Sequence, residues 1–401
     1  MSKKNRKWLV FTIMCLAYMP GSYAQYQLSV YASELIQSFG LTTSQFSSLF
    51  TAPMIVAIFL SFVGGMISDK VGSKKVINIS FVIAGIGMIG RVFANSYMPF
   101  FLCMALTGFS NMFVNINASK ITASWFEQEK LGILMGIFAF CGQLPGAFAT
   151  ATTAVLFDSR TSAFIVSAIF CISVFVLWLL FVKDKPEDTM EEREKIDQEN
   201  QPSIGDSLKV VLSNKGIWLV SICIMMALGS TVTLSTFMPM ALQTMYGIDM
   251  KVCGTIASML TLGNCIGSIT GPIVFSKIKN VKVFVSGAAV LSFAGIIMCW
   301  RFPSIFVLHI LVLYTGIMLG ASMPIFLSAP VLLEGLGTKY AGSAAGVIST
   351  LQLLGAVLIP TYILTPIAAE NYSLLFMLAS ICMVIMFLCG LLLPQFGNNQ
   401  K

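Results

Sequence analysis

Polar side chains recur inside, or at the ends of, the long apolar stretches of this chain. Polar groups are costly in a lipid environment, so residues that place them there are functional candidates by default. Amides and hydroxyls can hold a small organic solute by hydrogen bonds, and a lysine can attract an anion. The residues that we expect to contact such a solute are Tyr18, Ser22, Gln25, Asn111, Asn115, Lys120, Gln143, Thr233, Asn264, Tyr314 and Gln352.

Helical spacing brings some of these residues onto shared faces. Tyr18, Ser22 and Gln25 fall on one side of a helix, and Asn111 and Asn115 fall on one side of another. A proline–glycine pair between Tyr18 and Ser22 interrupts the first helix and frees backbone groups to line a cavity. The alternative is that these side chains only hydrogen-bond neighbouring helices. For these two faces we favour contact with a solute.

Charged side chains are scarce where a solute or a proton would have to pass. Lys120 either attracts an anionic solute or extends its amine to the membrane surface. We expect Arg91 and His309 to be ordinary interfacial residues near the outer ends of their helices; the alternative is that one of them contacts the solute or a proton. The sequence has no aspartate or glutamate deep inside an apolar stretch, which disfavours proton coupling through a buried carboxylate. The coupling ion and the direction of movement stay open.

The elements that must position these residues are membrane-spanning helices. Hydrophobic residues make up 57% of the chain and charged residues only 10%, whereas soluble domains carry about 25% charged residues. The apolar stretches are continuous and close to the ~20 residues that a helix needs to cross a bilayer. The sequence predicts an all-α membrane protein with twelve transmembrane helices near residues 9–31, 44–67, 75–96, 98–120, 131–155, 162–182, 216–240, 252–275, 282–301, 304–328, 340–363 and 371–393.

The distribution of positive charge predicts how the chain lies in the membrane. Lysines and arginines gather in alternate links, so we expect both termini on the cytoplasmic side of the cytoplasmic (plasma) membrane. We predict an N-terminal six-helix bundle over 1–182, a cytoplasmic linker with a short amphipathic helix over 183–215, and a pseudo-symmetric six-helix bundle over 216–401. The basic N-terminus imitates a secretory signal, but its apolar stretch is too long, so we expect it to be retained.

Several classes of protein are disfavoured by the sequence. The ten cysteines are scattered singly and the chain has one histidine, so we expect no metal site. We find no nucleophile–base set and no phosphate-binding glycine loop, so we expect neither an enzyme nor a cofactor. The net charge of +7 lies in links between apolar stretches and forms no nucleic-acid-binding array. We expect a monomer. Its expected partners are a small-molecule substrate, the lipid bilayer and, if movement of the substrate is coupled, an ion.

A short basic loop joins the second and third predicted helices. Its pattern is G-x-x-x-D-K-x-G-x-K-K, formed by Gly65, Asp69, Lys70, Gly72, Lys74 and Lys75. This pattern resembles the signature loop between the second and third helices of the major facilitator superfamily. We expect these residues to act as a gate, in which Asp69 docks at the positive N-terminal end of the eleventh helix when the cytoplasmic side is closed.

Two further features agree with that resemblance. The halves of the chain repeat weakly, since Leu131-Gly132-x-x-x-Gly136 aligns with Ala341-Gly342-x-x-x-Gly346. Trp125-Phe126, followed by a short charged turn and the first of these glycine pairs, resembles superfamily carriers for nitrate/nitrite, cyanate and oxalate/formate. The resemblance implies that helices one, four, seven and ten line the solute pathway.

The resemblance implies a secondary active or facilitative transporter that works by alternating access. The polar residues of the chain favour a small organic solute, such as a monocarboxylate-like anion. Nitrate is disfavoured as the solute. Resemblance to nitrate carriers implies opposing arginines in the middle of the membrane, and the apolar stretches of this chain have none there. The alternatives are an efflux carrier for amphipathic toxic compounds and a non-transporting membrane sensor on the same fold.

Overall fold

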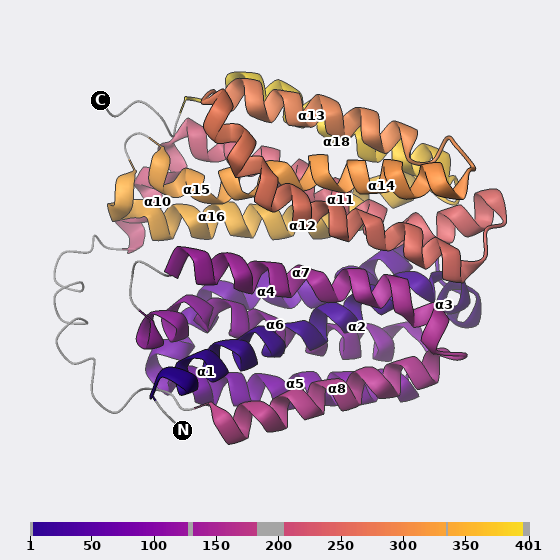
Figure 1. Ribbon diagram of the computed structural model, residues 1–401, viewed down its shortest axis with the longest axis horizontal. Helices are drawn as coiled ribbons and strands as arrows, with labels where there is room; N and C mark the ends of the chain where they lie inside the picture. Colours follow the sequence, from indigo (N-terminus) through magenta and orange to yellow (C-terminus); the bar gives the residue numbers. More distant parts are fainter. Residues whose placement is uncertain (1–2, 127–130, 183–203, 334–335, 396–401) are drawn as a thin grey trace. The chain divides into compact units, whose positions relative to one another are not determined.

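Helices form the regular structure of the described residues, which are 3–126, 131–182, 204–333 and 336–395 of a computed structural model (Figure 1). These residues contain no β-strand. Eleven of their helical stretches are long and apolar enough to cross a membrane. The first predicted span makes the twelfth, because it is divided into two helices that are each too short to be counted alone. The predicted all-α fold with twelve spans is confirmed.

The helices follow one another with short connections. Those of the first half are α1 (Lys3–Ala17), α2 (Met19–Val30), α3 (Ala32–Phe39), α4 (Thr43–Val71), α5 (Ser73–Phe93), α6 (Tyr97–Trp125), α7 (Leu131–Leu156) and α8 (Arg160–Phe181). Those of the second half are α10 (Ile204–Ser213), α11 (Lys215–Tyr246), α12 (Met250–Ile278), α13 (Val281–Met298), α14 (Ile305–Ala321), α15 (Met323–Leu332), α16 (Gly337–Leu358), the π-helix η2 (Ile359–Leu364), α17 (Thr365–Ala368) and α18 (Tyr372–Leu392).

Proline divides several of these spans. The first is broken at Tyr18, between α1 and α2, and Pro20 lies in the first turn of α2, where a missing N–H is tolerated. The tenth is broken at Ser322, between α14 and α15, with a proline again in the first turn of the second piece. In the eleventh, α16 passes into η2 at Pro360. Each break frees backbone groups that need new partners.

The chain divides into two compact units. The first comprises Met1–Thr189 and Ile248–Ser258, and the second comprises Met190–Gly247 and Met259–Lys401. The predicted domain boundaries stay predictions, and residues 183–203 of the predicted linker lie outside the described part of the chain. The rest of that linker contains α10, which packs against α11 and α16 and buries Val211.

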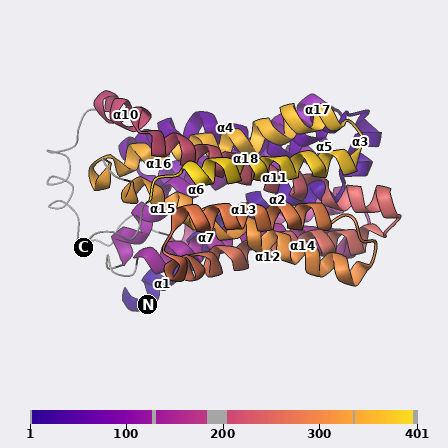
Figure 2. The same ribbon diagram turned by 90° about the horizontal axis from the view of Figure 1, so that it is seen from above.

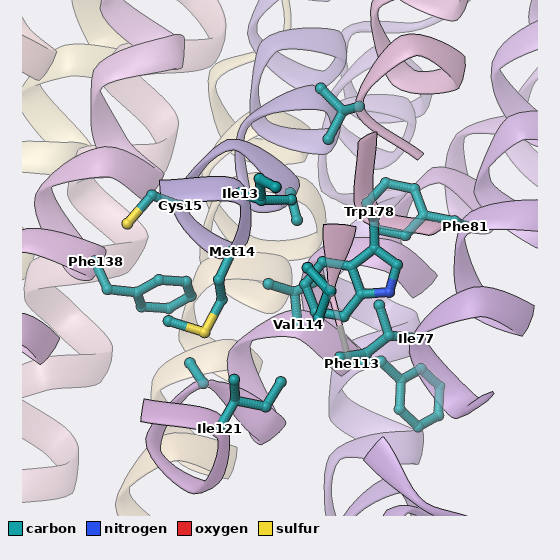
Figure 3. Packing of buried hydrophobic residues seen from close by; sticks show 14 of the residues in the cluster. Ile13, Met14, Cys15, Ile77, Phe81, Phe113, Val114, Ile121, Phe138 and Trp178 are labelled. Atoms are coloured by element: carbon teal, nitrogen blue, oxygen red, sulfur yellow. The ribbon is translucent and has the colours of Figure 1, made fainter. Parts of the chain in front are cut away.

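A hydrophobic cluster fills the first unit between α1, α5, α6, α7 and α8. Figure 3 shows Trp178, Ile77 and Phe81 on one side of this cluster and Met14 and Phe138 on the other. All five side chains are buried. The cluster fixes α1 against its neighbours, and α2, which follows α1, packs on α7. The polar residues of the first span are therefore carried on a well-packed frame.

Close contacts through glycine organise the second unit. Gly263 and Gly267 of α12 face α14, and Gly316 and Gly320 of α14 face α12. A Cβ atom at any of the four would collide with backbone of the opposite helix, so only glycine permits this separation. In the same unit α11 packs against α16 and α18, and α13 and α18 run side by side (Figures 1 and 2).

Candidate functional site

The break in the first span is joined to α6 by Asn111. In the amide orientation that pairs every group, Nδ2 donates to the carbonyl of Tyr18 at 3.2 Å, and Oδ1 accepts from the hydroxyl and the backbone N–H of Ser22, each at 3.1 Å. A Cβ atom at Gly21 would lie 2.5 to 2.9 Å from the atoms of the Asn111 amide group, so glycine makes room for the amide. The sequence placed these residues on two separate faces, and the structure brings them together.

Gln25 is buried one turn further along α2, on the same face as Ser22. Its side chain is 7% exposed and its Nε2 donates to the carbonyl of Phe50 at 2.9 Å. Phe50 lies one turn before Pro53, a proline inside α4, where the backbone ladder lacks an N–H. The Gln25 amide therefore connects the first span to the proline region of the second, and its oxygen is the part left for other partners.

Tyr18 and Gln143 come from helices that touch closely. The Tyr18 ring stacks on Phe138 with centroids 4.7 Å apart. A Cβ atom at Gly142 would collide with the same ring, so this glycine allows α7 to approach the break in the first span. The half-buried Gln143 follows directly on α7. The Tyr18 hydroxyl has no hydrogen-bond partner among the described residues.

Asn115 and Lys120 occupy the exposed part of α6. Both side chains are exposed in the first unit, whereas Asn111, one turn earlier than Asn115, is half-buried. Asn117 is buried and was not singled out by sequence: its Nδ2 donates to Ser68 Oγ at 3.0 Å and to the carbonyl of Phe113 at 2.8 Å. This amide links α6 to the last turn of α4, at a position between the predicted gate residues Gly65 and Asp69.

The gate residues are only partly described. Gly72 ends α4 and begins α5 with φ of +94°, a conformation that favours glycine. Lys74 is half-buried and Lys75 is exposed. The side chains of Gly65, Asp69 and Lys70 lie outside the described part of the chain, so their gating role stays a prediction.

The predicted site residues of the second unit divide into satisfied and unsatisfied groups. The buried Thr233 hydroxyl donates to the Gly229 carbonyl of its own helix at 2.8 Å. The Tyr314 hydroxyl lies 3.4 Å from the Leu291 carbonyl on α13. Asn264, which is 8% exposed, and the half-buried Gln352 have side-chain amides without a hydrogen-bond partner among the described residues. Those two amides retain the capacity to bind a solute.

Arg91 is the residue whose surroundings the sequence misjudged. The expected interfacial arginine is 1% exposed and lies inside the first unit. Its guanidinium donates to the Ala24 carbonyl and to Gln27 Oε1, each at 2.9 Å, and to the Ser167 hydroxyl. The sequence feature that could have indicated this burial is Gln27. It is a second amide in the first span and lies on the helix face opposite the predicted site.

The Arg91 network contains a charge without an opposite charge. The guanidinium lies 4.4 Å from the Phe164 ring centroid, a cation–π contact. No salt bridge to Arg91 occurs among the described residues, and its Nε has no partner there. Neutral acceptors from α2 and α8 therefore compensate a buried cation on α5. The described residues also contain no group of three histidine, cysteine or acidic side chains that could hold a metal ion.

Comparison with known proteins gives one consistent family. The family model described as Major Facilitator Superfamily matches residues 10–360. The chain is 23% identical to the probable sulfoacetate transporter SauU of Cupriavidus necator, covering 85% of this chain and 83% of the relative. It is 22% identical to the galacturonate transporter of Dickeya chrysanthemi, covering 74% and 90%.

Other matches carry different descriptions. The membrane sensor protein UhpC of Salmonella typhimurium is 23% identical over 88% of this chain and 83% of its own. The bacillibactin exporter of Bacillus subtilis is 23% identical over 86% of each chain. Among solved structures, a bacterial homologue of the human lysosomal transporter Spinster matches with a TM-score of 0.78 at 13% identity, covering 98% of this chain and 95% of that chain. The structural match supports the fold alone.

Proposed function

The chain belongs to the major facilitator superfamily, and we propose that it carries a small organic anion of the monocarboxylate type across the cytoplasmic membrane by alternating access. The observation that carries this proposal is the broken first span, where Tyr18, Ser22 and Asn111 form a polar cluster within the first unit. Two relatives, described as sulfoacetate and galacturonate transporters, are named for organic acids.

The contacts divide the predicted residues into two roles. Asn111 and Gln25 are engaged with backbone groups of other helices, so we assign them to holding the broken span in place. Asn115 and Lys120 are exposed, and Tyr18 keeps an uncommitted hydroxyl, so we assign these three to the solute. In this arrangement the amine of Lys120 supplies the positive charge for a carboxylate, and the amide and phenol supply hydrogen bonds.

Two alternatives have support among the relatives. Efflux of amphipathic toxic compounds is favoured by the likeness to a bacillibactin exporter, and a non-transporting sensor is favoured by the likeness to a membrane sensor protein. The proposal of anion transport differs from both in a measurable way. An anion carrier moves a carboxylate and needs a cation for it, an exporter of lipophilic cations does not, and a sensor moves nothing.

The experiment is transport by the full chain reconstituted into liposomes. Radiolabelled galacturonate, sulfoacetate and small monocarboxylates would be offered with and without a pH or sodium gradient, and a lipophilic cation would serve as the efflux probe. We expect uptake of at least one anion, reduced about tenfold or more in Lys120→Gln and Asn115→Ala. Gln37→Ala, an exposed amide on α3, is the matched control and should transport normally.

Three outcomes would contradict the proposal. Movement of the lipophilic cation alone would favour efflux. Binding of an anion without movement, measured by protection against thermal unfolding, would favour the sensor. Equal anion uptake by Lys120→Gln and the wild type would support an anion carrier but would show that Lys120 does not bind the anion. Asp69→Ala, tested in the same assay, addresses the gate separately, because its loss should change the rate of exchange and leave anion binding intact.

A further inference from the structure

A cavity of about 420 Å³ opens at one end of the second unit. It lies where α11 and α13 begin and where α15 and α18 end. Two of its lining residues are lysines, Lys215 and Lys282, and most of the others are apolar, including Leu219 and Leu392. The proposed transport site uses none of these residues, so the cavity needs a separate explanation.

The two lysines have no acidic partner among the described residues. Both side chains are exposed, and neither forms a salt bridge or another polar contact among the described residues. No aspartate or glutamate is among the described residues that line the cavity. Two positive charges on one concave surface repel each other, and an anion placed between them would relieve that repulsion.

The backbone adds to the positive potential. Asn214 begins α11 by accepting from the Gly216 N–H at 2.9 Å, and Gln395 Oε1 accepts from the Val281 N–H at the start of α13 at 3.2 Å. Two helix N-termini therefore meet at the cavity, and each carries partial positive charge. Gln395 also donates to the Lys279 carbonyl at 2.7 Å, which fixes this wall.

Aromatic and apolar side chains place the cavity at the boundary between water and lipid. Trp218, one turn into α11, is 42% exposed and its indole N–H donates to the Leu212 carbonyl at 2.8 Å. Tryptophan with an anchored N–H and an exposed ring is typical of the headgroup level of a membrane. Leu392 lines the same cavity and is 69% exposed, as expected of a side chain that faces acyl chains.

We propose that this cavity binds the headgroup phosphate of an anionic phospholipid. Lys215 and Lys282 contact the phosphate oxygens, and Leu219 and Leu392 contact the first part of an acyl chain. A soluble anion would use the lysines but would leave the apolar wall without a partner, and this is why the occupant is a lipid. The predicted orientation puts the site in the cytoplasmic leaflet, where anionic lipid supplies the ligand and lysines are attracted to it.

The test uses the full chain in mixed micelles that contain equal phosphatidylglycerol and phosphatidylcholine. Native mass spectrometry would count the lipids retained on the wild type and on the double variant Lys215→Gln/Lys282→Gln. We expect the wild type to retain phosphatidylglycerol preferentially. The variant should bind it roughly thirtyfold more weakly, which corresponds to about 1 kcal/mol for each lysine at an anionic surface. Lys215→Arg/Lys282→Arg keeps both charges and should retain the lipid.

The control changes the same number of charges elsewhere. Lys209→Gln/Lys277→Gln removes two exposed lysines of α10 and α12 that do not line the cavity, and it should bind phosphatidylglycerol as the wild type does. Equal loss in this control would show a general surface attraction and overturn the proposal. So would equal retention of phosphatidylcholine, or complete competition by millimolar inorganic phosphate or glycerol phosphate, which would identify a site for a soluble anion. Thermal unfolding in phosphatidylcholine alone checks that all variants fold.

Discussion

The third span of the first unit and the third span of the second unit end in arginines with opposite surroundings. Arg91 near the end of α5 is buried and donates to Ala24, Gln27 and Ser167. Arg301, just after α13, is exposed and stacks on Trp300 at 5.3 Å. The described residues of the second unit bury no charged side chain. Among the described residues, the first unit thus contains a buried charged connection and the second does not.

The comparison shows two ways of fixing helices in lipid. Both units use glycine contacts, since a Cβ atom at Gly108 of α6 would collide with Pro53 of α4 just as one at Gly267 would collide with α14. Among the described residues, only the first unit adds a buried cation, which requires acceptors in defined directions. This extra constraint lies in the unit whose first span is broken, and Ala24 and Gln27 belong to the second piece of that span. We infer that Arg91 holds α2 where α1 no longer continues into it.

The largest expected effect tests this buried connection. Replacing Gln27 by leucine removes an acceptor of the Arg91 guanidinium and leaves a buried cation less compensated. We expect a loss of about 3 kcal/mol in the free energy of unfolding, near the upper end of the contribution of a hydrogen bond to a charged group. The measurement is unfolding of the purified chain in mixed micelles by a denaturing detergent. Gln37→Leu, at an exposed position of α3, should change stability by less than about 0.5 kcal/mol.

A double variant separates the network from simple packing. In Arg91→Met/Gln27→Leu the unpaired charge is gone, so the loss should be smaller than in Gln27→Leu alone, by about 1 kcal/mol or more. If the loss of stability in the double variant equalled the sum of the losses in Arg91→Met and Gln27→Leu, the two side chains would contribute only by filling space. The two units would then differ in which residues they bury, but the buried arginine would not hold α2 in place.

The second effect concerns the glycine contact of the other unit. A methyl group at Gly267 would meet the Ile317 carbonyl of α14, so α12 and α14 would have to separate. We expect Gly267→Ala to destabilise the chain by about 2 kcal/mol, as overpacking does. Gly287→Ala is the matched control on α13, where no atom lies within contact of the added carbon. It should be neutral or stabilise by about 0.5 kcal/mol, because alanine favours helix more than glycine does.

The fold could be predicted from sequence, because apolar length and charge distribution are local signals. The continuous stretches near 20 residues determine spans, and the proline–glycine pair after Tyr18 indicates where the first span breaks. The Tyr18–Ser22–Asn111 contacts could be anticipated only in part, since helical spacing shows which residues share a face but not which helix that face meets. Asn111 is expected to contact a solute, which stays a prediction, and its amide pairs with Tyr18 and Ser22 of the broken span.

Arg91 shows why the other contacts between helices could not be predicted from the sequence. Its position near the end of an apolar stretch is compatible with either an exposed interfacial cation or a buried one. The choice depends on Ala24, Gln27 and Ser167, which come from other helices and are up to 76 residues away in the chain. The similar position of Arg301 and its exposed side chain confirm that local sequence does not decide between the two.

The smallest expected effect on stability separates holding the break from contacting the solute. Asn111→Ala removes the partners of Tyr18 and Ser22, and we expect a loss of about 1 kcal/mol in the free energy of unfolding, typical of one net hydrogen bond. Asn115→Ala changes an exposed side chain and should stay within about 0.5 kcal/mol of the wild type. Transport should respond in the opposite order, with the larger loss in Asn115→Ala.

This pair of variants also relates the broken span to the buried arginine. If Asn111 and Arg91 both hold α2, then Asn111→Ala combined with Gln27→Leu should cost more than the sum of the two single losses, because neither end of α2 remains fixed. Strictly additive losses would assign the two contacts to independent parts of the first unit. A transport defect in Asn111→Ala larger than that in Asn115→Ala would place Asn111 on the solute after all and reverse the roles assigned to the two amides of α6.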